Sequence, residues 1–128
     1  MNCVLIVDDE PGFREVLEIV LARAGFMTLT APNAAEAQSL LARSAVHLII
    51  LDDMMPGMSG TELCLQLKAD PRTHAIPILM HSAHERLHQP GYAERIGADG
   101  VLLKPCPPRE IVARVQSFFA ANAAQHAG

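Results

Sequence analysis

The sequence predicts an α/β domain built on a doubly wound, five-stranded parallel sheet with about five helices. Short apolar runs of strand length alternate with helical patterns along nearly the whole chain. This strict alternation favours parallel strands with helices on both faces of the sheet. The chain has 128 residues, half of them hydrophobic, which suits one domain rather than two.

Five strands are expected where short apolar runs occur. The runs cover residues 3–7, 27–31, 46–51, 76–81 and 100–103. The third run is unbroken and is therefore predicted to lie near the centre of the sheet, where both faces are buried.

Helices are expected between these strands, where apolar residues recur three and four positions apart. The patterns cover residues 13–24, the segment after Asn33, and residues 61–69, 83–96 and 107–119. Pro90-Gly91 falls inside the fourth pattern, so we expect this helix to be kinked, shortened or unwound there. One domain is predicted over residues 1–121, followed by a frayed, Ala-rich tail over 122–128.

Acidic residues follow two of the predicted strands. Asp8-Asp9-Glu10 come directly after the first strand, and Asp52-Asp53 come directly after the third. Five parallel strands suit the flavodoxin-like order 2-1-3-4-5, which places the carboxyl ends of strands one and three side by side. Clustered carboxylates repel each other, so a hard divalent cation with oxygen ligands is expected at this edge.

A hydroxyl and an ammonium group are predicted at the same edge of the sheet. Ser82 follows the fourth strand and Lys104 follows the fifth. Together with a divalent cation, these groups can hold a phosphoryl group, and an aspartate can accept that group as an acyl phosphate.

The motifs at these strand ends resemble the receiver domain of two-component response regulators. The matching segments, which follow one another in the expected order, are Val7-Asp8-Asp9-Glu10, Leu51-Asp52, Met55-Pro56-Gly57 with Gly60, Ser82-Ala83 and Lys104-Pro105. The resemblance covers nearly the whole chain. It implies a phosphorylation-dependent signalling switch in the cytoplasm that has no turnover of small molecules.

The resemblance also implies a role for each site residue. Asp52 would accept the phosphoryl group from a phosphohistidine on a sensor histidine kinase or a phosphotransfer protein. Asp8, Asp9, Asp52 and the backbone carbonyl of Met54 would hold Mg²⁺. Ser82 and Lys104 would bind phosphoryl oxygens, and Lys104 would pair with Asp52 beforehand. The phosphorylated state would then act on an output domain or partner protein that the sequence does not identify.

Three positions depart from the pattern of the resembling family or lack an assigned role. Val101 stands where such receivers usually carry a switching Tyr or Phe, and Cys106 stands where Phe is common. Asp53 adjoins Asp52, but successive strand residues point to opposite faces. We therefore expect Asp53 either to bond locally or to raise the negative potential.

Other functions remain as alternatives. The main one is a receiver-like docking module that works without phosphorylation. A haloacid-dehalogenase-like phosphatase would need a second aspartate where Met54 stands. An FMN-binding protein would need a phosphate-binding loop where Asp8-Asp9-Glu10 stand.

Composition also bears on nucleic-acid binding, membrane insertion, secretion and the state of the cysteines. A net charge of −4 argues against direct binding of nucleic acid, and no apolar run reaches the roughly 20 residues of a membrane span. We expect no secretory signal. Cys3, Cys64 and Cys106 lack metal-ligand spacing and are expected to be reduced and buried.

Overall fold

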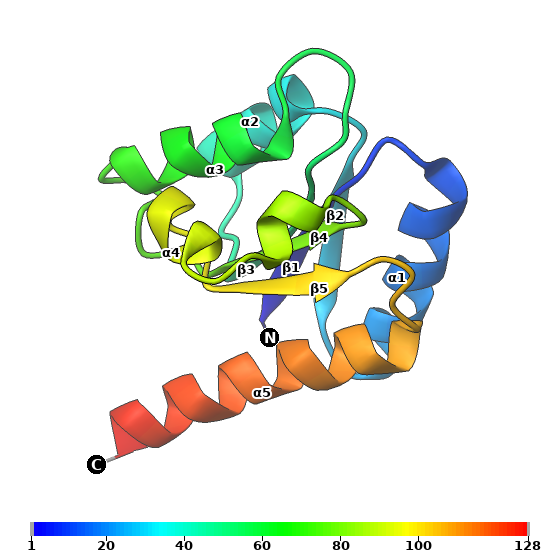
Figure 1. The fold of residues 1–128 in the computed structure, drawn as a ribbon. Helices are drawn as coiled ribbons and strands as arrows, with labels where there is room; N and C mark the ends of the chain where they lie inside the picture. Colours follow the sequence, from blue (N-terminus) through cyan, green and yellow to red (C-terminus); the bar gives the residue numbers. More distant parts are fainter. Residues whose placement is uncertain (1, 128) are drawn as a thin grey trace.

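The computed structural model describes residues 2–127 and contains one five-stranded parallel sheet in the order β2-β1-β3-β4-β5 (Figure 1). This confirms the predicted fold class and strand order. The strands are β1 (Cys3–Val7), β2 (Met27–Ala31), β3 (Leu48–Asp52), β4 (Ile78–Ser82) and β5 (Gly100–Leu103).

Helices cover both faces of the sheet. They are α1 (Pro11–Arg23), α2 (Ala34–Arg43), α3 (Gly60–Ala69), α4 (Tyr92–Ile96) and α5 (Pro108–Ala127), with a 3₁₀ helix, η1 (Glu85–His88), before α4. Helices α1 and α5 lie on one face, and α2, α3 and α4 lie on the other (Figure 1).

The alternation of side chains along β3 divides the core into two layers. Ile50 packs with Leu17 of α1 and Ile111 of α5, whereas Leu51 packs with Leu63 of α3. By the same alternation, Asp52 belongs to the α1/α5 side and Asp53 to the α3 side.

The predicted helix over 83–96 is divided in the structure. Its residues form η1 and the five-residue helix α4, separated by Gln89, Pro90 and Gly91. Pro90 lacks an amide donor and crowds the preceding turn, which destabilises a continuous helix at this point. Gly91 then adopts a φ of 82°, which is the left-handed region that favours glycine. Of the expected outcomes, shortening with partial unwinding is the one observed.

Element boundaries differ slightly from the prediction at two strands. β4 begins at Ile78 instead of Ile76, after Pro77, which has no amide hydrogen to donate to the sheet. β3 begins at Leu48 instead of Val46, and it ends on Asp52 itself rather than on Leu51.

Three further expectations concern the tail, the membrane and the cysteines. Fraying over 122–128 stays a prediction, because the side chains from 122 onward and all of residue 128 lie outside the described residues. Among the described residues, no helix combines the length and apolar character needed to span a membrane. The cysteines are free as expected, but Cys106 is only half-buried because it lies in the loop before α5.

Candidate functional site

The carboxyl ends of β1 and β3 bring the predicted acidic residues together. The two strands pair in register up to Val7 and Leu51, so the residues that follow them are neighbours. One carboxylate oxygen from each of Asp8, Asp9 and Asp52 lies within 4.8 Å of the others. Asp8 and Asp52 are buried, with exposed fractions of 1% and 3%, whereas Asp9 is exposed. The cluster therefore has a buried base and one side open to solvent.

Local hydrogen bonds hold Asp8 at the end of its strand. Its amide donates to the carbonyl of Ala31 at 3.1 Å, and its Oδ1 accepts the amide of Glu10 at 2.9 Å. Arg14 of α1 donates to the carbonyl of Asp8 at 2.7 Å. These bonds fix the backbone while the second carboxylate oxygen, Oδ2, remains directed at Lys104.

Lys104 brings a positive charge to the two buried carboxylates. Its Nζ lies 3.2 Å from Oδ1 of Asp52 and 3.3 Å from Oδ2 of Asp8. Its amide donates to the carbonyl of Ser82 at 3.1 Å, which ties the end of β5 to the end of β4. The expected pairing of Lys104 with Asp52 is therefore present in the structure.

The environment of Asp52 disfavours its charge despite this pairing. Burial, followed by repulsion from Asp8, raises the pKa of Asp52 from 3.8 to about 6, while Lys104 and the amide of Met54 act in the opposite direction. Burial works to lower the pKa of Lys104, but the carboxylates of Asp52 and Asp8 outweigh it and raise that pKa. The site is thus short of positive charge, which favours binding of a cation.

The donor set fits a hard divalent cation. Carboxylate oxygens are the preferred protein ligands of Mg²⁺, which keeps several waters and uses few protein groups. Three clustered aspartates, one of them exposed, match these requirements. The side chain of Met54 is 64% exposed, and the proposed role of its carbonyl as a ligand stays a prediction.

Ser82 lies at the predicted strand end, but its hydroxyl is engaged in a local bond. The residue is fully buried, and its Oγ accepts the amide of His84 at 3.0 Å. The hydroxyl therefore holds the first turn after β4. The hydroxyl hydrogen is not used in this bond and can be donated to another acceptor, such as a phosphoryl oxygen.

Asp53 has a structural role that the sequence left open. Its Oδ1 accepts hydrogen bonds from the amide of Thr61 at 2.9 Å and from the Thr61 hydroxyl at 2.7 Å. These bonds satisfy a free amide in the first turn of α3. Of the two expectations for Asp53, local bonding is the one observed.

Gly60 allows the start of α3 to approach the end of β3 closely. Its amide donates to the carbonyl of Asp53 at 3.0 Å, and a Cβ at this position would collide with the carbonyl of Asp52. A residue with a side chain would push α3 away from the strand. This glycine therefore sets the position of Asp53 relative to Thr61.

Phe13 and His81 adjoin the site and were not predicted. The Phe13 ring stacks on the imidazole of His81, with 4.9 Å between ring centroids, and the Nζ of Lys104 lies 5.6 Å from the Phe13 centroid. The only sequence signal was a polar residue, His81, in an otherwise apolar strand.

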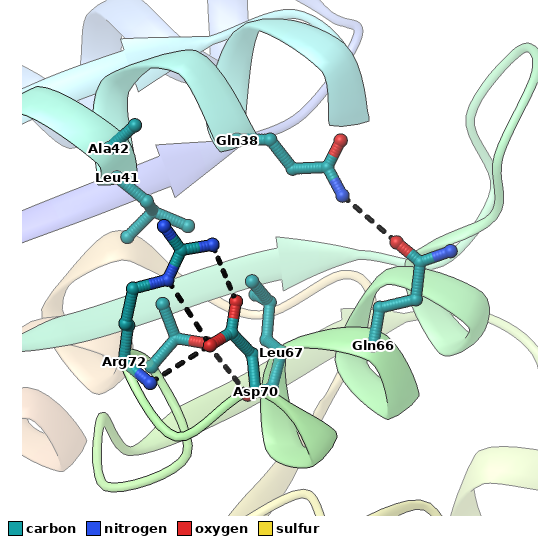
Figure 2. A pocket seen from close by; sticks show the side chains of 8 residues that line it. Gln38, Leu41, Ala42, Gln66, Leu67, Asp70 and Arg72 are labelled. Atoms are coloured by element: carbon teal, nitrogen blue, oxygen red, sulfur yellow. Dashed lines mark hydrogen bonds and ion pairs between the residues drawn. The ribbon is translucent and has the colours of Figure 1, made fainter.

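A separate cavity of about 450 Å³ lies between α2 and α3, away from the carboxylates (Figure 2). Gln38 donates to Gln66 across it at 2.9 Å, and Arg72 pairs with Asp70 at 3.1 Å. These polar groups are already bonded to each other, so the cavity offers no cluster comparable to that around Asp52.

Comparison with known proteins agrees with the fold. The family model described as "Response regulator receiver domain" matches residues 4–116, and the chain belongs to this family. Receiver domains of this family bind Mg²⁺ at an acidic pocket and interact with histidine kinases and output domains.

Two curated relatives are transcriptional regulators. The chain is 40% identical over 116 residues to the phosphate regulon transcriptional regulatory protein PhoB of Pseudomonas aeruginosa. The aligned segment covers 91% of this chain and 51% of that protein. It is 35% identical over 119 residues to the DNA-binding response regulator MtrA of Mycolicibacterium smegmatis, covering 93% and 51%. The chain thus spans about half the length of these relatives.

Two solved structures of similar fold are matched by this chain over nearly their entire length. The chemotaxis protein CheY4 of Vibrio cholerae has a TM-score of 0.83 and 29% identity, covering 91% of this chain and 98% of that one. The response regulator TrrA of Thermotoga maritima, solved in complex with Mg(2+)-BeF, has a TM-score of 0.80 and 29% identity, with the same coverage.

Proposed function

We propose that this receiver domain is a switch operated by Mg²⁺-dependent transfer of a phosphoryl group to Asp52. The donor is a phosphohistidine on a sensor histidine kinase or a phosphotransfer protein. The observation that carries this proposal is the buried Asp52 carboxylate, held 3.2 Å from Lys104 and beside Asp8 and Asp9.

In this proposal an oxygen of Asp52 attacks the phosphorus atom of the phosphohistidine. The new oxygen–phosphorus bond forms an acyl phosphate, and the nitrogen–phosphorus bond breaks, so that the imidazole leaves with the electron pair and takes up a proton. Lys104 stabilises the negative charge that remains on the phosphoryl oxygens. Asp8, Asp9, Asp52 and the Met54 carbonyl would hold Mg²⁺, which would supply further positive charge there. Hydrolysis of the acyl phosphate resets the switch, and no small-molecule turnover is expected.

The proposal is tested by incubating the protein with acetyl phosphate and Mg²⁺ and measuring its intact mass. We expect a gain of one phosphoryl group that is prevented by EDTA. Hydroxylamine should remove it, because acyl phosphates react with this nucleophile. Absence of any gain under conditions in which Mg²⁺ binds would instead support the phosphorylation-independent docking module.

The signal is proposed to leave the site through the loop after β4. An acyl phosphate carries a charge of about −2 in place of the single negative charge of the carboxylate, and it brings new acceptor oxygens. Ser82 can donate its hydroxyl hydrogen to these oxygens while its Oγ still accepts the amide of His84, so a movement of Ser82 toward the phosphoryl group would draw the His84 amide with it. Because Val101 cannot act as an aromatic switch, this linked movement offers a route to η1 and α4, and from there to an output domain or partner protein.

We expect phosphorylation to shift the backbone amide resonances of residues 83–87. The amide of His84 should change most, because it donates directly to the Ser82 hydroxyl. A Ser82→Ala variant, which lacks the hydroxyl, serves as the control and should show much smaller changes there. Unchanged amides at 83–87 in the phosphorylated wild-type protein would contradict this route.

A further inference from the structure

Lys104 is held by more than its two carboxylate partners. Its Nζ lies 5.6 Å from the centroid of the Phe13 ring of α1, within the range in which an ammonium group is attracted to an aromatic face. The Lys104 side chain is 28% exposed, and lysine carries its charge on a flexible four-carbon stem. Contact with an aromatic face restricts the positions that this ammonium can take.

The Phe13 ring is itself held by His81 of β4. The two rings are stacked, with an interplanar angle of 21° and a centroid distance of 4.9 Å. His81 pairs in the sheet with Asp52 on one side and with Leu102 on the other. The imidazole therefore lies on β4 beside Asp52, and its stack with Phe13 links β4 to α1.

His81 makes no hydrogen bond that would explain its presence in the core. The residue is 2% exposed, and neither ring nitrogen has a partner within the described part of the chain. Leaving a buried polar group unpaired is unfavourable, so an apolar residue here would stabilise the fold better. The stack with Phe13 is the specific contact that the imidazole does make.

We propose that Phe13 and His81 form an aromatic support that positions Lys104 between Asp8 and Asp52. Phe13 offers its face to the ammonium, and His81 fixes the plane of the Phe13 ring. Both are positioning residues, because they act on the phosphoryl group only through Lys104. The inference deepens the proposed function and rests on it for the role of Lys104.

The charge state of His81 is consistent with such a support. Burial, and then the nearby Lys104, lower the pKa of His81 from 6.5 to about 4. The ring is therefore neutral at physiological pH, and it adds no positive charge that would repel the ammonium.

The two lysines of the chain make a direct test possible. With lysine labelled at Cε, the spectrum contains one signal from Lys104 and one from Lys68, which pairs with Asp99 far from the site. In the unphosphorylated, metal-free protein, the Phe13 ring current should shift the ε protons of Lys104. A Phe13→Leu variant should lose this shift while leaving the Lys68 signal in place.

Phe26→Leu is the matched control. Phe26 forms an aromatic pair with Phe119 on the same face of the sheet, with 5.3 Å between centroids. This variant loses comparable ring contacts, yet it should leave both lysine signals unchanged. Equal changes at Lys104 in the two variants, or none in Phe13→Leu, would overturn the aromatic support.

Variants of His81 provide a second test that does not depend on replacing Phe13. His81→Phe preserves a stacked ring and should keep the Lys104 shift, whereas His81→Ala should reduce it. If the Lys104 shift were fully retained in His81→Ala as well as in His81→Phe, the role of His81 would be contradicted.

Phosphorylation by acetyl phosphate should slow about threefold to tenfold in Phe13→Leu, as expected from the strength of an ammonium–aromatic contact. An unchanged rate would contradict the link to phosphoryl transfer. If the wild-type protein takes up no phosphoryl group, the proposed function fails, while the lysine signals still decide whether the support exists.

Discussion

Replacing Asp52 with Asn is expected to abolish the mass gain from acetyl phosphate and, at the same time, to stabilise the metal-free protein. The amide cannot form the acyl phosphate, so the reaction is lost completely. The folded state becomes more stable because a buried charge beside Asp8 is removed. We expect an increase in the free energy of unfolding on the order of 2 kcal/mol at pH 7, from a pKa shift of about two units.

The pH dependence of this gain follows from the direction of the shift. The pKa of Asp52 is raised to about 6 in the folded protein, above its ordinary value of 3.8, so the folded state binds this proton more tightly than the unfolded state. The contribution of Asp52 to the stability of the wild-type protein therefore decreases as the pH rises from about 4 through about 6. Urea unfolding in EDTA should show a large difference between the two proteins at pH 7 and almost none near pH 4. A variant less stable than wild type at pH 7 would refute this explanation.

Asp53→Asn is the matched control for this experiment. Asp53 carries the same charge one residue away, but it bonds to Thr61 on the opposite face of β3. We expect this variant to retain the mass gain and to lose a modest amount of stability, because an amide oxygen still accepts from Thr61. Phosphorylation that persists in Asp52→Asn and disappears in Asp53→Asn would reverse the assignment of the nucleophile.

Replacing Lys104 with Met is expected to destabilise the metal-free protein by about 3 kcal/mol at pH 7. Asp8 and Asp52 are 1% and 3% exposed, and both would lose their only cation among the described residues. Breaking a buried ion pair by removing one partner leaves uncompensated charge, which is more costly than removing the whole pair. Phosphorylation by acetyl phosphate should slow at least tenfold, since the ammonium no longer offsets charge on the phosphoryl oxygens.

A double-mutant cycle separates the lost ion pair from a general packing effect. In the Asp52→Asn background, Lys104→Met leaves one buried carboxylate unpaired rather than two, so the loss of stability should be clearly smaller. Equal losses in both backgrounds, measured by urea unfolding in EDTA, would show that Lys104 contributes through packing alone.

The sequence was sufficient for the fold and for the centre of the site because both follow from strand order. Alternating strands and helices define the sheet, and the order 2-1-3-4-5 places Asp8 beside Asp52. Lys104 could be placed because it directly follows the fifth strand at the same edge. The pattern could not determine how Pro90-Gly91 would divide a helix, since local backbone geometry decides between kinking and shortening.

Contacts that depend on the path of a loop or the packing of a helix were not predictable in this way. The bond between Asp53 and Thr61 requires the loop to return closely at Gly60, which the sequence marks only as a turn. The stack of His81 on Phe13 joins residues 68 positions apart, and no spacing rule connects them. The chain-specific features of the site therefore lie mainly in contacts beyond the family motif.

The contact between Asp53 and Thr61 also implies a constraint on evolution. An acidic residue directly after Asp52 is acceptable here because two donors of Thr61 occupy its Oδ1. Without the Thr61 hydroxyl, the Asp53 carboxylate would keep only one of these two hydrogen bonds and would be held less firmly on the α3 side of the sheet. Across related sequences, positions 53 and 61 should therefore covary, with an acidic residue at 53 accompanied by Thr or Ser at 61 and an apolar residue at 53 free of that requirement.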